Sequence, residues 1–164
     1  MIGIAAIMAS TFVSGIACVA PIMVLALFAH VPARSTELVT AHPATLDIIV
    51  NGARSQQGVI QLVLCPDHSG FPECADRAMR SASLPISKGS ASAHLTDIPA
   101  GTYAVGVFHD TNANGKLDTF LGIPREGFGF SRNPPLRPRA PRFEEAAVPV
   151  VEHAKMQISL RYIL

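Results

Sequence analysis

Charge is scarce in this sequence and absent from its beginning. The 164 residues carry 13 basic and 12 acidic side chains, which gives a formal net charge of +1 at pH 7. This balance argues against capture of nucleic acid by overall charge, so no nucleic-acid partner is expected. None of these charged side chains lies in residues 1–31, which are mainly Ala, Ile, Val, Met, Leu and Phe. The chain therefore divides into an apolar leader and a mature part of about 130 residues, the size of one domain.

The leader has two interpretations. The first is a signal peptide at residues 1–33, because Ala33 and the residues before it loosely fit a cleavage site ahead of Arg34. The second is an uncleaved membrane anchor at residues 2–29, because about 20 apolar residues suffice to cross a bilayer. The positive charges that usually begin a signal peptide are missing. Both interpretations place the mature part outside the cytoplasm, periplasmic or secreted, with membrane contact only through this segment.

Cysteine is also scarce. Cys18 lies in the leader, and the mature part has only Cys65 and Cys74. In an oxidising compartment, a pair this close in a Pro- and Gly-containing stretch is typical of a disulfide that closes a surface loop. A metal site here would need more ligands than Asp67, His68 and Glu73 supply.

Helical periodicity is rare in the mature part, whereas period-two alternation is common. The alternating runs lie within residues 46–51, 60–64, 91–96, 103–110 and 156–162. Alternation directs one set of side chains to a core and the other to water, which predicts strands. Turn signals such as Asn51-Gly52 and Asn114-Gly115 separate the runs. Only residues 73–81 lose the alternation, and a short helix is conceivable there.

One turn and the strand after it narrow the fold class. Residues 95–110 read LTDIPAGTYAVGVFHD, where Pro99 and Gly101 predict a tight turn and Tyr103 an inward ring whose hydroxyl finds a partner. This segment resembles the turn and strand of transthyretin-like and immunoglobulin-like sandwiches on bacterial surfaces. We therefore expect an all-β, antiparallel β-sandwich of this type at residues 44–164, after an apolar leader helix and a linker at residues 34–43.

Residues 110–118 carry an oxygen-bearing side chain at nearly every second position. The side chains at positions 1, 3, 5 and 9 of an EF-hand-type calcium loop are Asp110, Asn112, Asn114 and Asp118. Gly115 takes the sharp-turn position, and the backbone carbonyl of Lys116 takes position 7. Position 12 is Leu121 rather than Glu, and Glu126 would serve only if the loop folded back. Calcium is therefore the one cofactor considered, with weak affinity, ~10⁻⁴–10⁻³ M.

The same loop has two other interpretations. Asp, Asn and Gly also build hairpin loops through Asx-turns without any ion. Alternatively, a metal-dependent hydrolase would use His109, Asp110, Asp118 and Glu126. No nucleophile with an adjacent base is recognisable, so we predict no catalytic residue and no enzyme.

Residues 122–142 combine glycine, phenylalanine, proline and arginine. Gly122, Gly127 and Gly129 lack the following Lys-Ser or Lys-Thr of a phosphate cradle. Phe128 and Phe130 are expected to pack into the end of the sandwich. Residues 132–142, with four Arg and four Pro, are expected to be extended and solvated, with contact to anionic lipid or polysaccharide as the alternative.

The central segment GTYAVGVFHDTNANGKLDTFLGIPREGFGFSRN closely resembles the bacterial secreted-protein family catalogued as domain of unknown function 2141. The matching motifs are Gly-x-Tyr at 101–103, His-Asp-x-Asn-x-Asn-Gly-x-Leu-Asp at 109–118 and Gly-x-Pro-x-Glu-Gly-x-Gly-Phe-Ser at 122–131. Residues 143–146 resemble the family's return strand, and the resemblance spans residues 44–163. The chain departs from the family in the Arg/Pro insertion between Asn133 and Phe143. The resemblance implies fold and location more than function, because the family has no established activity.

These observations predict an exported, non-catalytic, envelope-associated binding or accessory domain. Its expected partner is an envelope protein or a glycan, with calcium as a stabilising ion at the 110–118 loop. The alternatives are the metal-dependent hydrolase and a membrane-tethered structural spacer.

Overall fold

The computed structural model describes residues 42–164. The predicted signal peptide, anchor and leader helix, and nearly all of the predicted linker, lie outside the described residues. Within residues 42–164, no helix has the length and apolar character needed to span a membrane.

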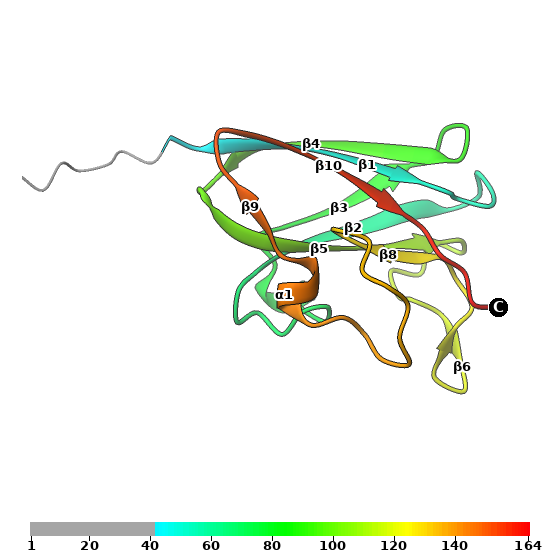
Figure 1. The fold of residues 1–164 in the computed structure, drawn as a ribbon. Coiled ribbons are helices and arrows are strands. Elements are labelled where there is room, and N and C mark those ends of the chain that lie inside the picture. Colours follow the sequence, from blue (N-terminus) through cyan, green and yellow to red (C-terminus); the bar gives the residue numbers. More distant parts are fainter. Residues whose placement is uncertain (1–41) are drawn as a thin grey trace, which may run out of the picture. The chain divides into compact units, whose positions relative to one another are not determined.

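Two β-sheets face each other and form a sandwich (Figure 1). The first sheet has the strand order β10-β1-β4, with β1 (Ala44–Asn51), β4 (Ser90–Ile98) and β10 (His153–Ser159). The second has the order β3-β2-β5-β8, with β2 (Val59–Pro66), β3 (Arg80–Pro85), β5 (Gly101–Asp110) and β8 (Phe128–Phe130). The short strand β9 (Val148–Val150) pairs with another part of β5. The all-β sandwich predicted from the alternating runs is confirmed.

Alternation determines which side chains form the core between the sheets. Every second residue of β1 is buried, and the same holds along most of β2. The largest fully buried core side chains include Leu46, Ile48, Ile60, Leu62 and Leu64. Each such side chain contributes about 1.5–3 kcal/mol by leaving water. The hydrophobic core is thus the physical reason that the alternating runs form strands.

The turn before β5 forms as predicted. The ring of Tyr103 is buried, and its hydroxyl donates a hydrogen bond to the carbonyl of Pro99 at 2.9 Å. This bond joins β5 to the first residue of the turn and satisfies the one polar atom of the buried side chain.

The pairing of β10 with β1 is parallel, which corrects the purely antiparallel prediction. The chain enters β10 from β9, and the backbone N–H of Thr45 donates to the carbonyl of Glu152 just before β10 begins. Both strands therefore begin at the same end of the sheet and run in the same direction. Alternation is identical in the two directions, so it carries no information about this choice.

Two segments differ from their predicted secondary structure. Residues 73–81 contain only a 3₁₀ turn, Ala75–Arg77, before β3 begins at Arg80. Residues 143–146 form the helix α1 (Phe143–Ala146) rather than the return strand, which is β9. The helix is favoured because the Glu145 carboxylate accepts the backbone N–H of Arg142 at 2.7 Å and so caps the first turn.

Candidate functional site

The 110–118 loop connects β5 to the hairpin β6 (Thr119–Phe120)–β7 (Ile123–Pro124) and closes around Asp110. The buried Asp110 carboxylate accepts the backbone N–H groups of Asn114 and Gly115 at 3.0 and 2.8 Å. It also accepts the side-chain amide of Gln61 on β2 at 3.0 Å. Burial alone would raise the pKa of Asp110, but these hydrogen bonds outweigh it and hold the pKa below its ordinary value.

The other oxygen-bearing side chains of the loop gather around Asp118. Asn112 and Asn114 donate their side-chain amides to the two Asp118 carboxylate oxygens at 2.8 and 3.1 Å. Their side-chain oxygens accept the backbone N–H groups of Asn114 and Lys116. The structure therefore brings the predicted calcium ligands into one loop, with amide nitrogens rather than oxygens toward Asp118. In the described residues, no group of three or more His, Cys, Asp or Glu is arranged to hold a metal ion.

Glu126 folds back onto the loop. Its buried carboxylate accepts the backbone N–H of Thr111 at 2.8 Å and that of Asp118 at 3.0 Å. Each oxygen of Glu126 thus satisfies one backbone donor at an end of the loop, and this contact holds the two ends together.

His109 is buried beside the loop, with both ring nitrogens in contact with the chain. Its Nδ1 lies 2.8 Å from the hydroxyl of Tyr162, and its Nε2 lies 2.9 Å from the carbonyl oxygen of Gln57. Since a carbonyl only accepts, Nε2 carries a hydrogen, and in the neutral ring Nδ1 accepts a hydrogen bond from the Tyr162 hydroxyl. Arg54 makes a cation–π contact with Tyr162, because its guanidinium carbon lies 4.1 Å from the centre of the Tyr162 ring.

The predicted disulfide joins Cys65 at the end of β2 to Cys74, with Cα atoms 6.0 Å apart. The loop that it closes carries Phe71 across the outer face of the second sheet. The Phe71 ring packs edge-to-face against Phe130 at 5.6 Å and against Phe143 of α1 at 6.4 Å. The disulfide thereby fixes an aromatic cluster on the outside of the sandwich.

Phe128 and Phe130 do not enter the sandwich, which corrects the sequence-based expectation. They lie on the outer face of the second sheet, whereas Gly127 and Gly129 are buried. A Cβ atom at Gly127 would come within 2.3 Å of the Tyr162 ring, and one at Gly129 within 2.8 Å of Ile158. The glycines are needed for close packing between the sheets, and this alternation turns the two rings outward.

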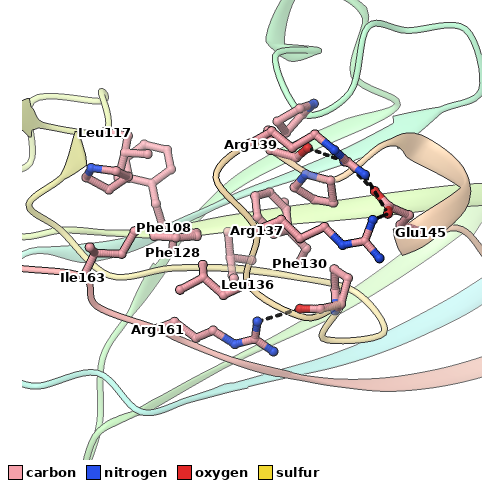
Figure 2. A pocket seen from close by; sticks show the side chains of 18 of the residues that line it. Phe108, Leu117, Phe128, Phe130, Leu136, Arg137, Arg139, Glu145, Arg161 and Ile163 are labelled. Carbon is pink, nitrogen blue, oxygen red and sulfur yellow. Dashed lines mark hydrogen bonds and ion pairs between the residues drawn. The ribbon is translucent and has the colours of Figure 1, made fainter. Parts of the chain in front are cut away.

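A groove of about 780 Å³ lies on this outer face. Its floor is formed by outward side chains of β2, β5 and β8, and its roof by the Pro- and Arg-rich residues 133–141. Figure 2 shows Leu117 and Ile163 at one end of the groove and Arg137, Arg139 and Glu145 at the other. The floor residues are Val63, Gly106, Phe108, Phe128 and Phe130. The groove is therefore apolar along its length and charged at one end.

Ion pairs hold the charged end in place. Arg139 contacts both oxygens of Glu145, at 2.8 and 3.0 Å, and Arg137 contacts one oxygen at 3.2 Å. The Arg139 hydrogen bonds, helped by the backbone N–H of Arg142, lower the pKa of Glu145 to about 2. The carboxylate is thus ionised at neutral pH and holds the roof segment against α1.

A second polar cluster lies on the outer face of the first sheet. His94 and His153 each contact the carboxylate of Asp47, at 2.6 and 3.1 Å. The hydrogen bond from His94 lowers the pKa of Asp47. This cluster comes from three strands and was not predicted, because no local spacing connects its members.

The groove was also missed by sequence reasoning. Its sequence signals are the Phe-Gly-Phe motif of β8 and the proline-rich residues 133–141, and no local pattern connects the two. Only the second sheet, which places β5 and β8 beneath the proline-rich segment, shows that they form one site.

The family model described as an uncharacterized protein conserved in bacteria, domain of unknown function 2141, matches residues 48–159. The comparison with curated proteins finds no match, and neither does the comparison with solved structures. The family match covers the second half of β1, all of β10 and everything between them, so it includes strands of both sheets, the 110–118 loop and most of the groove. This chain therefore belongs to the bacterial family of domain of unknown function 2141.

Proposed function

We propose that this chain is an exported, non-catalytic binding domain of the bacterial cell envelope and that the groove is its binding surface. The observation that carries the proposal is the groove itself. Its volume of about 780 Å³ falls within the ~300–1,000 Å³ typical of ligand sites. It also has the usual composition of such sites, with aromatic and aliphatic walls and a few polar groups.

A non-catalytic role is supported by the contacts of the hydrolase candidates. His109 is occupied at both ring nitrogens. Asp110 and Glu126 accept backbone N–H groups. A general base needs a free acceptor within reach of a substrate. These three side chains instead serve as hydrogen-bond partners of the loop and its surroundings.

An extracytoplasmic location is supported by the disulfide between Cys65 and Cys74, since such bonds persist in oxidising compartments. The uncharged leader supports the same location. N-terminal sequencing of the chain that a bacterial host accumulates separates the cleaved domain from the membrane-tethered spacer. A mature chain that begins near Arg34 supports the former, and an intact leader supports the latter.

Binding through the groove is tested by thermal unfolding of the full chain with envelope fractions of lipid, glycan and protein. At least one fraction should raise the unfolding temperature. Leu136→Ser should reduce that rise, because Leu136 is 57% exposed at the groove, whereas Val151→Ser, at 58% exposed and outside the groove, should not. If no fraction has an effect, or if both variants behave like the wild type, the proposed binding surface is wrong.

A second proposal concerns calcium at the 110–118 loop, where four oxygen-bearing side chains lie together. Binding would require Asn112 and Asn114 to turn their oxygens toward Asp118 and give up the present hydrogen bonds, so we expect affinity no tighter than ~10⁻⁴–10⁻³ M. Calorimetric titration with calcium should then give heat and a raised unfolding temperature that Asp118→Asn removes. Absence of both at concentrations well above this range would reject the calcium site.

A further inference from the structure

We propose that the groove binds an anionic amphiphile, a molecule with a hydrocarbon chain and a carboxylate or phosphate group at one end. The hydrocarbon chain lies along the phenylalanine floor, and the anionic group lies beside Arg137. This inference rests on the proposed function and specifies the chemical class of its ligand.

The apolar part of the groove fits a hydrocarbon chain. Phe108 and Phe128 are cross-strand partners on β5 and β8, and the rings of Phe128 and Phe130 lie 5.9 Å apart, so the three side chains line the groove next to one another. Leu136, Ile123 and Ile163 line the groove while they remain 57%, 41% and 45% exposed. Large apolar side chains that gather at one exposed site usually mark an interaction surface, because covering them removes apolar area from water.

The charged end fits an anion. Over the whole lining, three arginines and two glutamates leave one positive charge, and Arg137, Arg139 and Glu145 lie at the charged end. Arg139 is held by both oxygens of Glu145, and Arg161 donates to the backbone carbonyls of Asn133 and Pro134. In the part of the chain that the structure describes, the Arg137 guanidinium makes one ion pair and its side chain is 53% exposed. Its remaining N–H donors match a carboxylate or phosphate.

A sugar fits the groove less well than an amphiphile. Sugar hydroxyls need many hydrogen-bond partners, and the described lining has few polar side chains and no Trp or Tyr. Among these polar side chains, the Asn133 amide is already bonded to the backbone of Gln157 and Ser159. The four prolines of the roof fix their own φ angles, which reduces the backbone ordering that binding would cost.

The test is calorimetric titration of the full chain with four probes below their micelle concentrations. Dodecanoate and dodecyl phosphate carry both features, dodecanol has the chain without the charge, and butyrate has the charge without the chain. At least one of the two charged long-chain probes should saturate a single site, with dodecanol and butyrate at least ~10-fold weaker. The ratio of the dissociation constants of dodecanoate and dodecyl phosphate distinguishes a carboxylate ligand from a phosphate ligand.

Two variants test where the anion lies. Arg137→Gln should weaken binding of the preferred charged probe by ~10-fold and leave dodecanol unchanged, because only the head-group contact is lost. Lys155→Gln removes one positive charge from an exposed position on the other sheet and should change nothing. Equal binding of dodecanol and the charged probes, or no effect of Arg137→Gln, overturns the proposal.

The two proposals can fail separately. If no probe binds but an envelope fraction still raises the unfolding temperature in a Leu136-dependent manner, the amphiphile is wrong and the binding domain stands. If neither the probes nor the fractions have an effect, both proposals are wrong.

Discussion

Buried polar side chains hold the segments next to the 110–118 loop together by hydrogen bonds. His109 lies 2% exposed between Gln57 and Tyr162, and its two hydrogen bonds join β5 to the β1–β2 connection and to the C-terminal segment. A buried polar group without a hydrogen-bond partner lowers the free energy of unfolding. His109, the Tyr162 hydroxyl and the Gln57 carbonyl therefore stabilise the fold as one hydrogen-bonded group. At the scale of single residues, packing and hydrogen bonding account for the position of His109 beside the loop.

Removal of the His109 side chain tests this interpretation. We expect His109→Ala to lower the free energy of unfolding by about 2–3 kcal/mol, because the Tyr162 hydroxyl loses its buried partner and a cavity forms. Urea unfolding measures the change. His68→Ala is the matched control, because the His68 side chain is 93% exposed and its loss should cost less than about 0.5 kcal/mol. Equal effects of the two variants would contradict a structural role for His109.

The close packing at Gly127 predicts a second single-residue effect. Gly127→Ala places a methyl group against the Tyr162 ring, with the new Cβ only 2.3 Å from the nearest ring carbon. The free energy of unfolding should therefore fall by about 1–3 kcal/mol. Gly106→Ala is the comparison, because its Cβ would meet no atom closer than 3.4 Å. The prediction fails if denaturant midpoints of the two variants coincide.

At the scale of elements, the 110–118 loop is held by carboxylates that accept backbone N–H groups. Asp110 anchors it to β2 through Gln61, and Glu126 joins its two ends. The hydrogen bonds to Asp110 favour its ionised form, since protonation removes charge from the acceptor. The stability of the loop should therefore depend on pH.

Asp110 gives this dependence a definite sign. Its pKa is lowered in the folded protein, so its stabilising contribution is complete above the unfolded pKa of about 3.9 and is lost as the pH falls through the folded value. Wild-type stability should therefore drop more steeply below about pH 4 than that of Asp110→Asn, as measured by unfolding at each pH. Asp76→Asn, at an exposed position, is the control and should retain the wild-type slope. If the free energy of unfolding falls with pH at the same rate in the wild type and in Asp110→Asn, Asp110 is not the source of the pH dependence.

At the scale of the whole molecule, the two sheets of the described domain share one core, and the Cys65–Cys74 disulfide fastens the outer layer. The bond holds the loop with Phe71 against Phe130 and α1, at the end of the groove near Glu145. The fold does not depend on this bond alone, because the core lies between the sheets. Reduction of the disulfide is therefore expected to lower the stability of the folded domain without unfolding it.

Reduction should lower the free energy of unfolding by about 2–3 kcal/mol, since the bond closes a short loop of the unfolded chain. Unfolding with and without a reductant measures this effect. A variant with both Cys65→Ala and Cys74→Ala should not respond to the reductant, which controls for side effects. A wild-type protein with the same stability in both conditions would show that the bond contributes nothing.

The sequence alone determined the strands β1, β2, β4, β5 and β10, the Tyr103 turn and the disulfide pair, because each rests on neighbours along the chain. Period-two alternation is a local property, and so are a Pro-x-Gly turn and two nearby cysteines. The sequence also showed that the residues of the 110–118 loop would act together. It did not show that Asp110 would be bonded to Gln61, which lies on another strand.

Only the tertiary structure decided the direction of β10, the outward side of Phe128 and Phe130, and the existence of the groove. Each of these depends on which distant segments meet: Glu152 with Thr45 of β1, Gly127 with Tyr162, and residues 133–141 with β5 and β8. Alternation separates two faces of a strand but does not say which partner will cover each face. That choice is made by the packing of the whole chain, so the binding surface became visible only in the folded molecule.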